Sequence, residues 1–387
     1  MPAMQPTMPP VQPIAVEVAP VRPGEALDWA AIDAYLKAHA PGLDGKLNGE
    51  LSVLQFPNGS ANLTYLLRYG AQELVLRRPP FGIIAPGAHD MKREFKVLSR
   101  LWKHTRLAPR AFVFCDDKSV CGADFFVMER RTGVVVRNAI PDALRQHENV
   151  GYRLGLAVVD AMAELHSLDP VACDLADLGK PEGFAARQVA GWNKRWQLVR
   201  PSYENGHGAA AFSADSAVKV DADLMDSIAA RLAVSTPSAQ RASLVHNDLK
   251  PDNLQFDPAD PDHAKSIFDW DMTTVGDPLI DVGTLIQYWP DASDPDFHLL
   301  SSQPGMLEMG LPSRAEVAAR YAERTGSNID ALPWWIGFAY WKTAVVLMQL
   351  NSRYLRGEST DPRMLTLGER IPGVMAKANA VLQRANI

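Results

Sequence analysis

Cysteine is scarce in this chain, which has three in 387 residues. Cys115, Cys121 and Cys173 are odd in number and form no CxxC pair. Disulfide-stabilised scaffolds and structural zinc sites use paired, closely spaced cysteines, so we expect neither of them here. We interpret the chain as a cytoplasmic protein whose thiols are reduced.

The chain also lacks a long apolar run and an excess of positive charge. Its most apolar stretch, Trp334 to Leu350, has Lys342 at its centre and is shorter than the roughly 20 residues that span a bilayer, so we predict a buried core helix there. The formal net charge of -6 argues against nucleic-acid or membrane binding. Because no Lys or Arg precedes Arg22, we expect no secretory or transit signal, and the proline-rich residues 1–27 are predicted to form a flexible tail.

Several catalytic signatures are missing as well. The sequence contains no G-x-S-x-G elbow, no Walker P-loop, no G-x-G-x-x-G and no H-E-x-x-H. Hydrolase, P-loop and dinucleotide-binding functions therefore lack the residues that would carry them.

The pattern of apolar residues predicts an α+β protein with two lobes. Residues 51–78 contain three strand-like runs separated by Pro57-Asn58-Gly59 and by Tyr69-Gly70, and two more runs follow at 111–115 and 125–129. A polar turn is expected between these last two runs. Residues 27–39, with Asp28 as the candidate N-cap, and residues 89–104 have helical spacing, and most segments beyond 138 are also helical. We therefore predict a small lobe with five antiparallel strands over residues 28–131 and a large helical lobe over residues 132–387.

Three polar residues have the spacing that phosphoryl transfer requires. Asp248, in "HNDLKPDN", is the candidate catalytic base, and Asn253 follows it at the spacing of the D-x-x-x-x-N catalytic loop. Asp269 is predicted to end the short strand "KSIFDW". An amide oxygen and a carboxylate are hard ligands suited to magnesium, so Asn253 and Asp269 are candidate metal ligands. We interpret His246 as a residue that packs the loop.

These motifs resemble those of the aminoglycoside phosphotransferase superfamily, whose fold is similar to that of protein kinases. The resemblance covers residues 51–356 and is carried by "HNDLKPDN", "FDWDMTTVGDP" and "GDPLIDVG". It implies ATP and Mg²⁺ as cofactors, contact of Lys250 with the transferred phosphate, and a structural role for Asp281 in holding the catalytic loop. Asp277-Pro278 predicts a helix that starts there and extends to about Trp289.

The small lobe supplies the candidate nucleotide-binding residues. "FPNGSANLTY" occupies the place of the phosphate-covering turn, with Gly59, Ser60 and Asn62 as candidates. Arg77 stands where kinases generally have a lysine, and we predict that it forms an ion pair with Glu94 on the inward face of the following helix. The remaining nucleotide-binding candidates are Met128 and Glu129, at the end of the fifth strand-like run.

The acceptor is expected to be a small molecule that carries a hydroxyl group. Only "WDMTTV" separates Asp269 from Gly276, and no Ala-Pro-Glu follows, so the platform on which protein kinases bind peptides is missing. Stretches such as "VLRRPP" and "MAELHSLDP" resemble the kinase-like domains associated with acyl-CoA dehydrogenases, which implies a hydroxyacyl-CoA acceptor. Arg195, Arg353 and Arg356 are candidate contacts for CoA phosphates. An aminoglycoside or macrolide kinase is the alternative, and a nucleotide-binding pseudokinase is the alternative from another class; the oligomeric state is open.

Overall fold

The computed structural model describes residues 17–43, 45–57, 62–82, 90–204, 220–291, 294, 297–301, 303–358 and 363–387. Its contacts divide the chain into two compact units. The first comprises Met1–Ser99 and Pro109–Arg130, and the second comprises Arg100–Ala108 and Arg131–Ile387. The functions assigned from sequence to the ranges 28–131 and 132–387 stay predictions.

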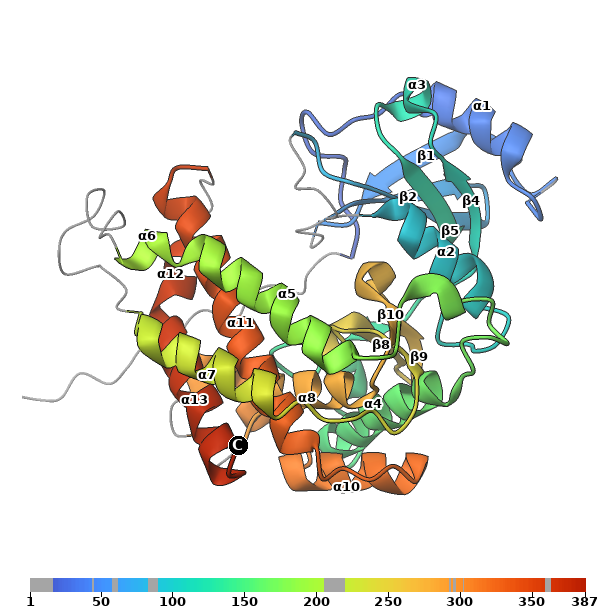
Figure 1. The fold of residues 1–387 in the computed structure, drawn as a ribbon. Coiled ribbons are helices and arrows are strands. Elements are labelled where there is room, and N and C mark those ends of the chain that lie inside the picture. Colours follow the sequence, from blue (N-terminus) through green and yellow to red (C-terminus); the bar gives the residue numbers. More distant parts are fainter. Residues whose placement is uncertain are drawn as a thin grey trace, which may run out of the picture. The chain divides into compact units, whose positions relative to one another are not determined.

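The first unit is built on an antiparallel sheet of five strands in the order β1-β2-β3-β5-β4 (Figure 1). The strands are β1 (Leu51–Gln55), β2 (Leu63–Tyr69), β3 (Gln72–Arg78), β4 (Ala111–Cys115) and β5 (Phe125–Glu129). Gly70, in the tight turn between β2 and β3, has a φ of 56°, a conformation that glycine adopts without strain. The predicted five-stranded antiparallel sheet is confirmed.

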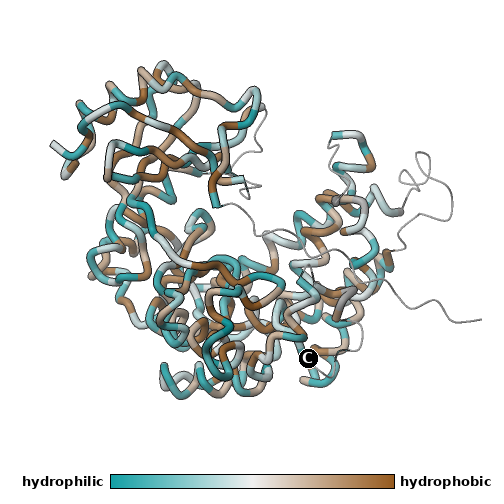
Figure 2. Tube along the Cα trace, turned by 180° about the vertical axis from the view of Figure 1, so that it is seen from behind, coloured by the Kyte–Doolittle hydropathy of each residue, from teal (hydrophilic) through white to brown (hydrophobic). Residues whose placement is uncertain are grey.

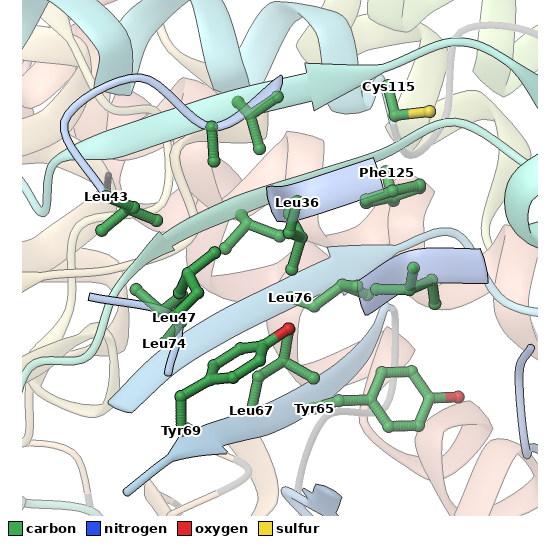
Figure 3. Packing of buried hydrophobic residues seen from close by; sticks show 14 of the residues in the cluster. Leu36, Leu43, Leu47, Tyr65, Leu67, Tyr69, Leu74, Leu76, Cys115 and Phe125 are labelled. Atoms are coloured by element: carbon green, nitrogen blue, oxygen red, sulfur yellow. The ribbon is translucent and has the colours of Figure 1, made fainter. Parts of the chain in front are cut away.

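The two faces of this sheet are covered by different helices. Helix α1 (Trp29–His39) packs Leu36 against alternate residues of the strands, among them Leu67 and Leu74, in the cluster drawn in Figure 3. Helix α2 (Met91–Leu101) lies on the other face, where the Phe95 ring is 6.4 Å from that of Phe126. Since side chains alternate between the faces of a strand, one set of residues serves each helix.

Two local predictions for this unit need comment. The Ala31 N–H donates a 2.9 Å hydrogen bond to Asp28 Oδ1, so the predicted cap of the first helix is confirmed. The segment between β4 and β5 was predicted to be a polar turn, but it contains the short helix α3 (Lys118–Cys121), which Asp117 caps through the Ser119 N–H.

The second unit is mainly helical and contains two small sheets, ordered β10-β7 and β6-β8-β9. The strands are β6 (Val134–Val135), β7 (Ser243–Val245), β8 (Leu254–Asp257), β9 (Asp260–Ile267) and β10 (Thr274–Gly276). The helices are α4 (Val150–Ser167), α5 (Phe184–Val199), α6 (Pro201–Glu204), α7 (Ala222–Val234), α8 (Leu279–Tyr288), α9 (Phe297–Leu300), α10 (Arg314–Thr325), α11 (Leu332–Leu355), α12 (Arg363–Glu369) and α13 (Ile371–Arg384). The predicted α+β architecture, with a small sheet-based part and a large, mainly helical part, is therefore confirmed.

Helix α11 forms the centre of the second unit's core. Its aromatic residues Trp334, Trp335 and Trp341 are buried, as predicted for this apolar stretch. Gly283 of α8 lies directly against α11, because a Cβ added there would come within 2.7 Å of the carbonyl carbon of Trp335. Figure 2 shows hydrophobic stretches along the strands of the first unit and in the interior of the second. None of the described helices combines the length and apolarity that crossing a bilayer requires.

Two element boundaries differ slightly from the prediction. Strand β9 ends at Ile267, so Asp269 follows the strand instead of ending it, and it adopts a left-handed conformation with a φ of 64°. Helix α8 begins at Leu279 and ends at Tyr288, one residue inside each predicted limit. Asp277 still caps its first turn, because Asp277 Oδ1 accepts a 2.9 Å hydrogen bond from the Leu279 N–H.

Candidate active site

The loop that follows β7 is held by a carboxylate from α8. Asp281 Oδ2 accepts a 2.7 Å hydrogen bond from the His246 N–H, and Oδ1 accepts a 2.6 Å bond from the Asn247 N–H. Asn247 has a φ of 66°, which turns the chain sharply just before Asp248. The structural role expected for Asp281 is therefore confirmed.

A buried histidine supports Asp281 from behind. His166 of α4 makes a 3.0 Å hydrogen bond to Asp281 Oδ2 through Nε2 and a 2.9 Å bond to the Tyr321 hydroxyl through Nδ1. Although burial opposes ionisation, the hydrogen bonds from His166 and from the His246 N–H hold the pKa of Asp281 below its usual range. A carboxylate that stays ionised keeps both loop amides bonded.

The two oxygens of Asp248 have different surroundings. Oδ2 accepts hydrogen bonds from Lys250 Nζ at 2.9 Å and from Asn253 Nδ2 at 3.1 Å. Within the described part of the chain, no donor bonds to Oδ1. His246 orients the loop, since its Nδ1 accepts from the Asp248 N–H at 3.3 Å and its Nε2 lies 2.8 Å from the Phe268 carbonyl oxygen. The carboxylate thus has one tethered oxygen and one oxygen that can accept a further hydrogen bond.

Lys250 is a cation within this network. Its ammonium also lies 5.0 Å from the centre of the Tyr288 ring. Burial lowers the pKa of Lys250, but the neighbouring Tyr288, Asp248 and Asp252 raise it more, so the net pKa lies above its usual value. Lys250 therefore remains charged beside the carboxylate of Asp248. Its predicted contact with a phosphate stays a prediction.

Asn253 and Asp269 are brought together by the backbone. Asn253 lies in the single 3₁₀ turn Pro251–Asn253, and its carbonyl oxygen accepts a 2.8 Å bond from the Phe268 N–H, next to Asp269. Because Asn253 Nδ2 donates to Asp248, the side-chain oxygen remains as the ligand atom. An amide oxygen and a carboxylate fit the preference of magnesium for a few protein oxygens completed by phosphates and water. Among the described residues no group of three or more His, Cys, Asp or Glu side chains could hold a metal ion.

The path from Asp269 to the next helix is short and structured. It passes through the 3₁₀ turn Trp270–Met272 into β10, which pairs with β7. No segment of the kind that forms a peptide platform in protein kinases occurs between residues 267 and 291, all of which are described.

In the first unit, the predicted ion pair is present. The Arg77 Nη1 atom of β3 lies 2.6 Å from Glu94 Oε1 of α2, and both side chains are buried. Asn62 is buried at the start of β2 and Met128 near the end of β5, where Glu129 is half-buried. The predicted Gly59 and Ser60 lie outside the described residues. The nucleotide-binding role of all these residues stays a prediction.

Helices α5 and α11 bring together residues that the sequence kept apart. The Arg195 guanidinium lies 4.6 Å from the centre of the Trp192 ring, and Lys342 Nζ lies 5.6 Å from the same ring. Lys342 also donates to the Asn247 carbonyl at 3.4 Å. Sequence reasoning noted Lys342 only as a charge within an apolar helix; its isolation there was the signal that it needs a polar partner.

The other two arginines considered for CoA phosphates do not join this group. Arg356 forms an exposed ion pair with Glu358 at 2.6 Å, just after α11 ends. Arg353, near the end of α11, is exposed. Of the three candidates, only Arg195 contacts Trp192 in the described structure.

Comparison with known proteins is consistent with these features. A family model described as "Phosphotransferase enzyme family" matches residues 52–327. Human acyl-CoA dehydrogenase family member 11 is 29% identical over 350 residues, which make up 89% of this chain and 42% of that protein. The chain therefore spans less than half the length of this curated relative. The resemblance inferred from sequence is confirmed.

Solved structures share the fold. A candidate aminoglycoside phosphotransferase from Ralstonia eutropha is 25% identical, with a TM-score of 0.73 over 93% of this chain and 99% of that chain. A spectinomycin phosphotransferase, solved with ADP and spectinomycin, is 12% identical, with a TM-score of 0.56 over 93% of this chain and 100% of that chain. At such low identity the second structure supports the fold alone.

Proposed function

This chain belongs to the phosphotransferase enzyme family, and on that premise we propose that it transfers the γ-phosphoryl group of ATP to a hydroxyl group of a small molecule, with a hydroxyacyl-CoA as the acceptor. The observation that carries the proposal is the unequal environment of the Asp248 carboxylate, with Lys250 and Asn253 bonded to Oδ2 only. A general base needs one oxygen held in place and another aimed at the proton that it receives.

Asp248 orients the acceptor in the proposed reaction. The acceptor hydroxyl donates to Asp248 Oδ1, and its oxygen forms a bond to the γ-phosphorus while the bond from that phosphorus to the bridging oxygen of ADP breaks. The hydroxyl proton passes to Asp248, and ADP leaves. Magnesium held by Asn253 and Asp269 would neutralise charge on the phosphate oxygens.

The first unit supports nucleotide binding. A buried arginine held by a buried glutamate has its side-chain position set in advance, and its guanidinium is a good partner for phosphate. We assign Arg77 this role together with Asn62, Met128 and Glu129. An arginine presents a planar fork of donors where a lysine presents a point charge, so it orients phosphate oxygens as well as neutralising them.

The acyl-CoA acceptor rests on the similarity to acyl-CoA dehydrogenase family member 11, of which this chain matches 42%. The name of that protein refers to acyl-CoA compounds, and we extend this compound class to the acceptor of the present chain. An aminoglycoside or macrolide kinase is the alternative, because structures with those activities share the fold.

The test incubates the protein with ATP and Mg²⁺ and with separate hydroxyacyl-CoAs, aminoglycosides and macrolides, and follows the gain of one phosphoryl group by mass spectrometry. Transfer to a hydroxyacyl-CoA alone supports the proposal. Transfer to an antibiotic alone replaces the acceptor class. Nucleotide binding without transfer to any compound would favour a pseudokinase.

Asp248→Ala tests the base directly. We expect kcat to fall by about 10²–10⁴-fold, because the group that receives the hydroxyl proton is removed. ATP affinity, measured by calorimetry, should change little. A variant that keeps the wild-type kcat would contradict the role assigned to Asp248.

A further inference from the structure

Two cations of the second unit have no acidic partner. Within the described residues, Lys342 and Arg195 form no ion pair; their polar contacts are the carbonyl oxygens of Asn247 and Gly191, at 3.4 and 3.3 Å. Other cations of this unit do pair with carboxylates, as Arg320 does with Asp160 at 2.8 Å. Lys342 is partly buried, so its ammonium has lost some of its water without forming an ion pair, whereas Arg195 is exposed.

One aromatic ring brings the two cations close together. Arg195 and Trp192 lie on α5, and Lys342 lies on α11, which packs against α5. Both charges face the Trp192 ring, at 4.6 and 5.6 Å from its centre. A ring in contact with two cations attracts each of them but leaves their mutual repulsion uncompensated. Burial, together with the charges of Lys250 and Arg195, lowers the pKa of Lys342, whereas Asp248 and Asp281 oppose this shift.

This pair lies next to the candidate base. The carbonyl oxygen that Lys342 contacts belongs to Asn247, the residue immediately before Asp248. A molecule whose hydroxyl meets Asp248 Oδ1 would therefore lie close to Lys342. An anion on that molecule would supply the ion-pair partner that Lys342 and Arg195 lack within the described residues.

We propose that Lys342 and Arg195, which both lie against the Trp192 ring, bind an anionic group of the acceptor and thereby select anionic acceptors over polycationic ones. This inference rests on the proposed function, since it concerns the acceptor of that reaction. The anionic group is a phosphate or a carboxylate, both of which accept charge-assisted hydrogen bonds from these side chains. An aminoglycoside would bring its own ammonium groups against both cations, which disfavours it as a substrate.

The variants for the test are Lys342→Met and Arg195→Gln, which remove the charges and keep much of the side-chain length. Lys194→Gln is the matched control, because Lys194 is an exposed cation on the same helix. The acceptors are a hydroxyacyl-CoA, the free hydroxy acid, and the hydroxyacyl-pantetheine, which has the same acyl group without any phosphate. For each combination of protein and acceptor, kcat and the KM for the acceptor are measured at saturating ATP. The KM for ATP is then measured for each protein.

We expect each variant to raise the KM for an anionic acceptor by about tenfold or more, the usual effect of losing one hydrogen bond to a charged group. The KM for ATP and the values of the control should stay within about twofold. A rise in KM confined to the CoA thioester identifies phosphate as the bound group. A rise in the KM for the free hydroxy acid identifies the carboxylate. Either result supports the proposal.

If the variants raise the KM for the neutral pantetheine thioester as much as the KM for the anionic acceptors, the proposal is overturned, because Lys342 would then act only by holding the Asn247 carbonyl. Unchanged KM values in both variants would overturn it too. Calorimetry without ATP separates this inference from the proposed reaction. If the wild-type protein transfers no phosphoryl group but binds an anionic compound, and if the variants bind that compound more weakly, the anion-binding site is supported and the proposed reaction is rejected. A wild-type protein that binds none of the anionic compounds would overturn the inference.

Discussion

At the scale of single residues, the candidate site depends on which atom of each polar side chain is already hydrogen-bonded and which atom remains available. Asn253 uses its amide nitrogen to bond Asp248, which directs its oxygen elsewhere, and its backbone bonds Phe268, the residue before Asp269. Asn253, itself a candidate metal ligand, therefore links the candidate base Asp248 to the segment that carries Asp269, the other candidate metal ligand. This arrangement explains why the spacing between Asp248 and Asn253 matters for the chemistry.

Asp269→Ala tests the metal role at this scale. We expect the dissociation constant for ATP in the presence of Mg²⁺ to rise by about tenfold or more, because one carboxylate ligand is lost. Binding of ATP measured in EDTA should differ little between the variant and the wild type. Equal affinities in Mg²⁺ would remove Asp269 from the metal site.

At the scale of secondary-structure elements, the crossing of α8 and α11 sets the position of the catalytic loop. Asp281, which bonds the loop backbone, lies on α8 two residues before Gly283. Gly283 in turn lies against the backbone of Trp335 on α11. The packing of these helices therefore determines where the loop is held.

Gly283→Ala should lower the free energy of unfolding by about 1–3 kcal/mol, because its new methyl group would overlap the α11 backbone. Gly191→Ala on α5 is the control, since the nearest atom to its added Cβ is 3.7 Å away. In that variant alanine should be neutral or stabilising by about 0.5–1 kcal/mol, through its better helix propensity. Urea denaturation measures both, and equal effects would contradict the packing argument.

Asp281→Asn tests the support of the loop through its pH dependence. The pKa of Asp281 in the folded protein is lowered, so its ionisation stabilises the fold above the pKa of the unfolded chain, and this contribution is lost as the pH falls. We expect the variant to be less stable by about 1–3 kcal/mol at pH 7. The difference should persist down to about pH 5 and shrink below it. Urea denaturation at a series of pH values checks this, and a difference that grew on acidification would refute it.

At the scale of the whole molecule, the chain forms two units that each have their own core. In the first, α1 packs on one face of the sheet; in the second, helices pack around α11. Cores that are separate can lose stability separately.

Leu36→Ala tests this separation, because Leu36 is buried in the core of the first unit. We expect that unit to lose about 2–5 kcal/mol. Hydrogen exchange should accelerate in β2 and β3 while the amides of α8 and α11 keep their protection. Leu198→Ala, at a position that is 72% exposed, is the control and should change neither. Equal acceleration in both units would show that they unfold together.

Much of the fold follows from local sequence patterns, because interactions between residues close together in the chain determine where many helices and strands form. Runs of apolar and aromatic residues and the turn residues between them were enough to predict the five strands, and Asp28 was enough to predict where α1 begins. The limits of β9 and α8 were less exact, since the ends of elements depend on tertiary hydrogen bonds such as the one from the Phe268 N–H to the Asn253 carbonyl.

The sequence by itself determined the family and the candidate residues Asp248, Asn253 and Asp269, because they lie close together along the chain at a characteristic spacing. Only the tertiary structure decided which oxygen of Asp248 is tethered and that Lys342 and Arg195 meet at Trp192. The contact between Lys342 and Trp192 joins residues from two different helices, and its distance depends on how those helices pack. The type of reaction is therefore predicted by local spacing, whereas the acceptor selection that we propose depends on side chains that only folding brings together.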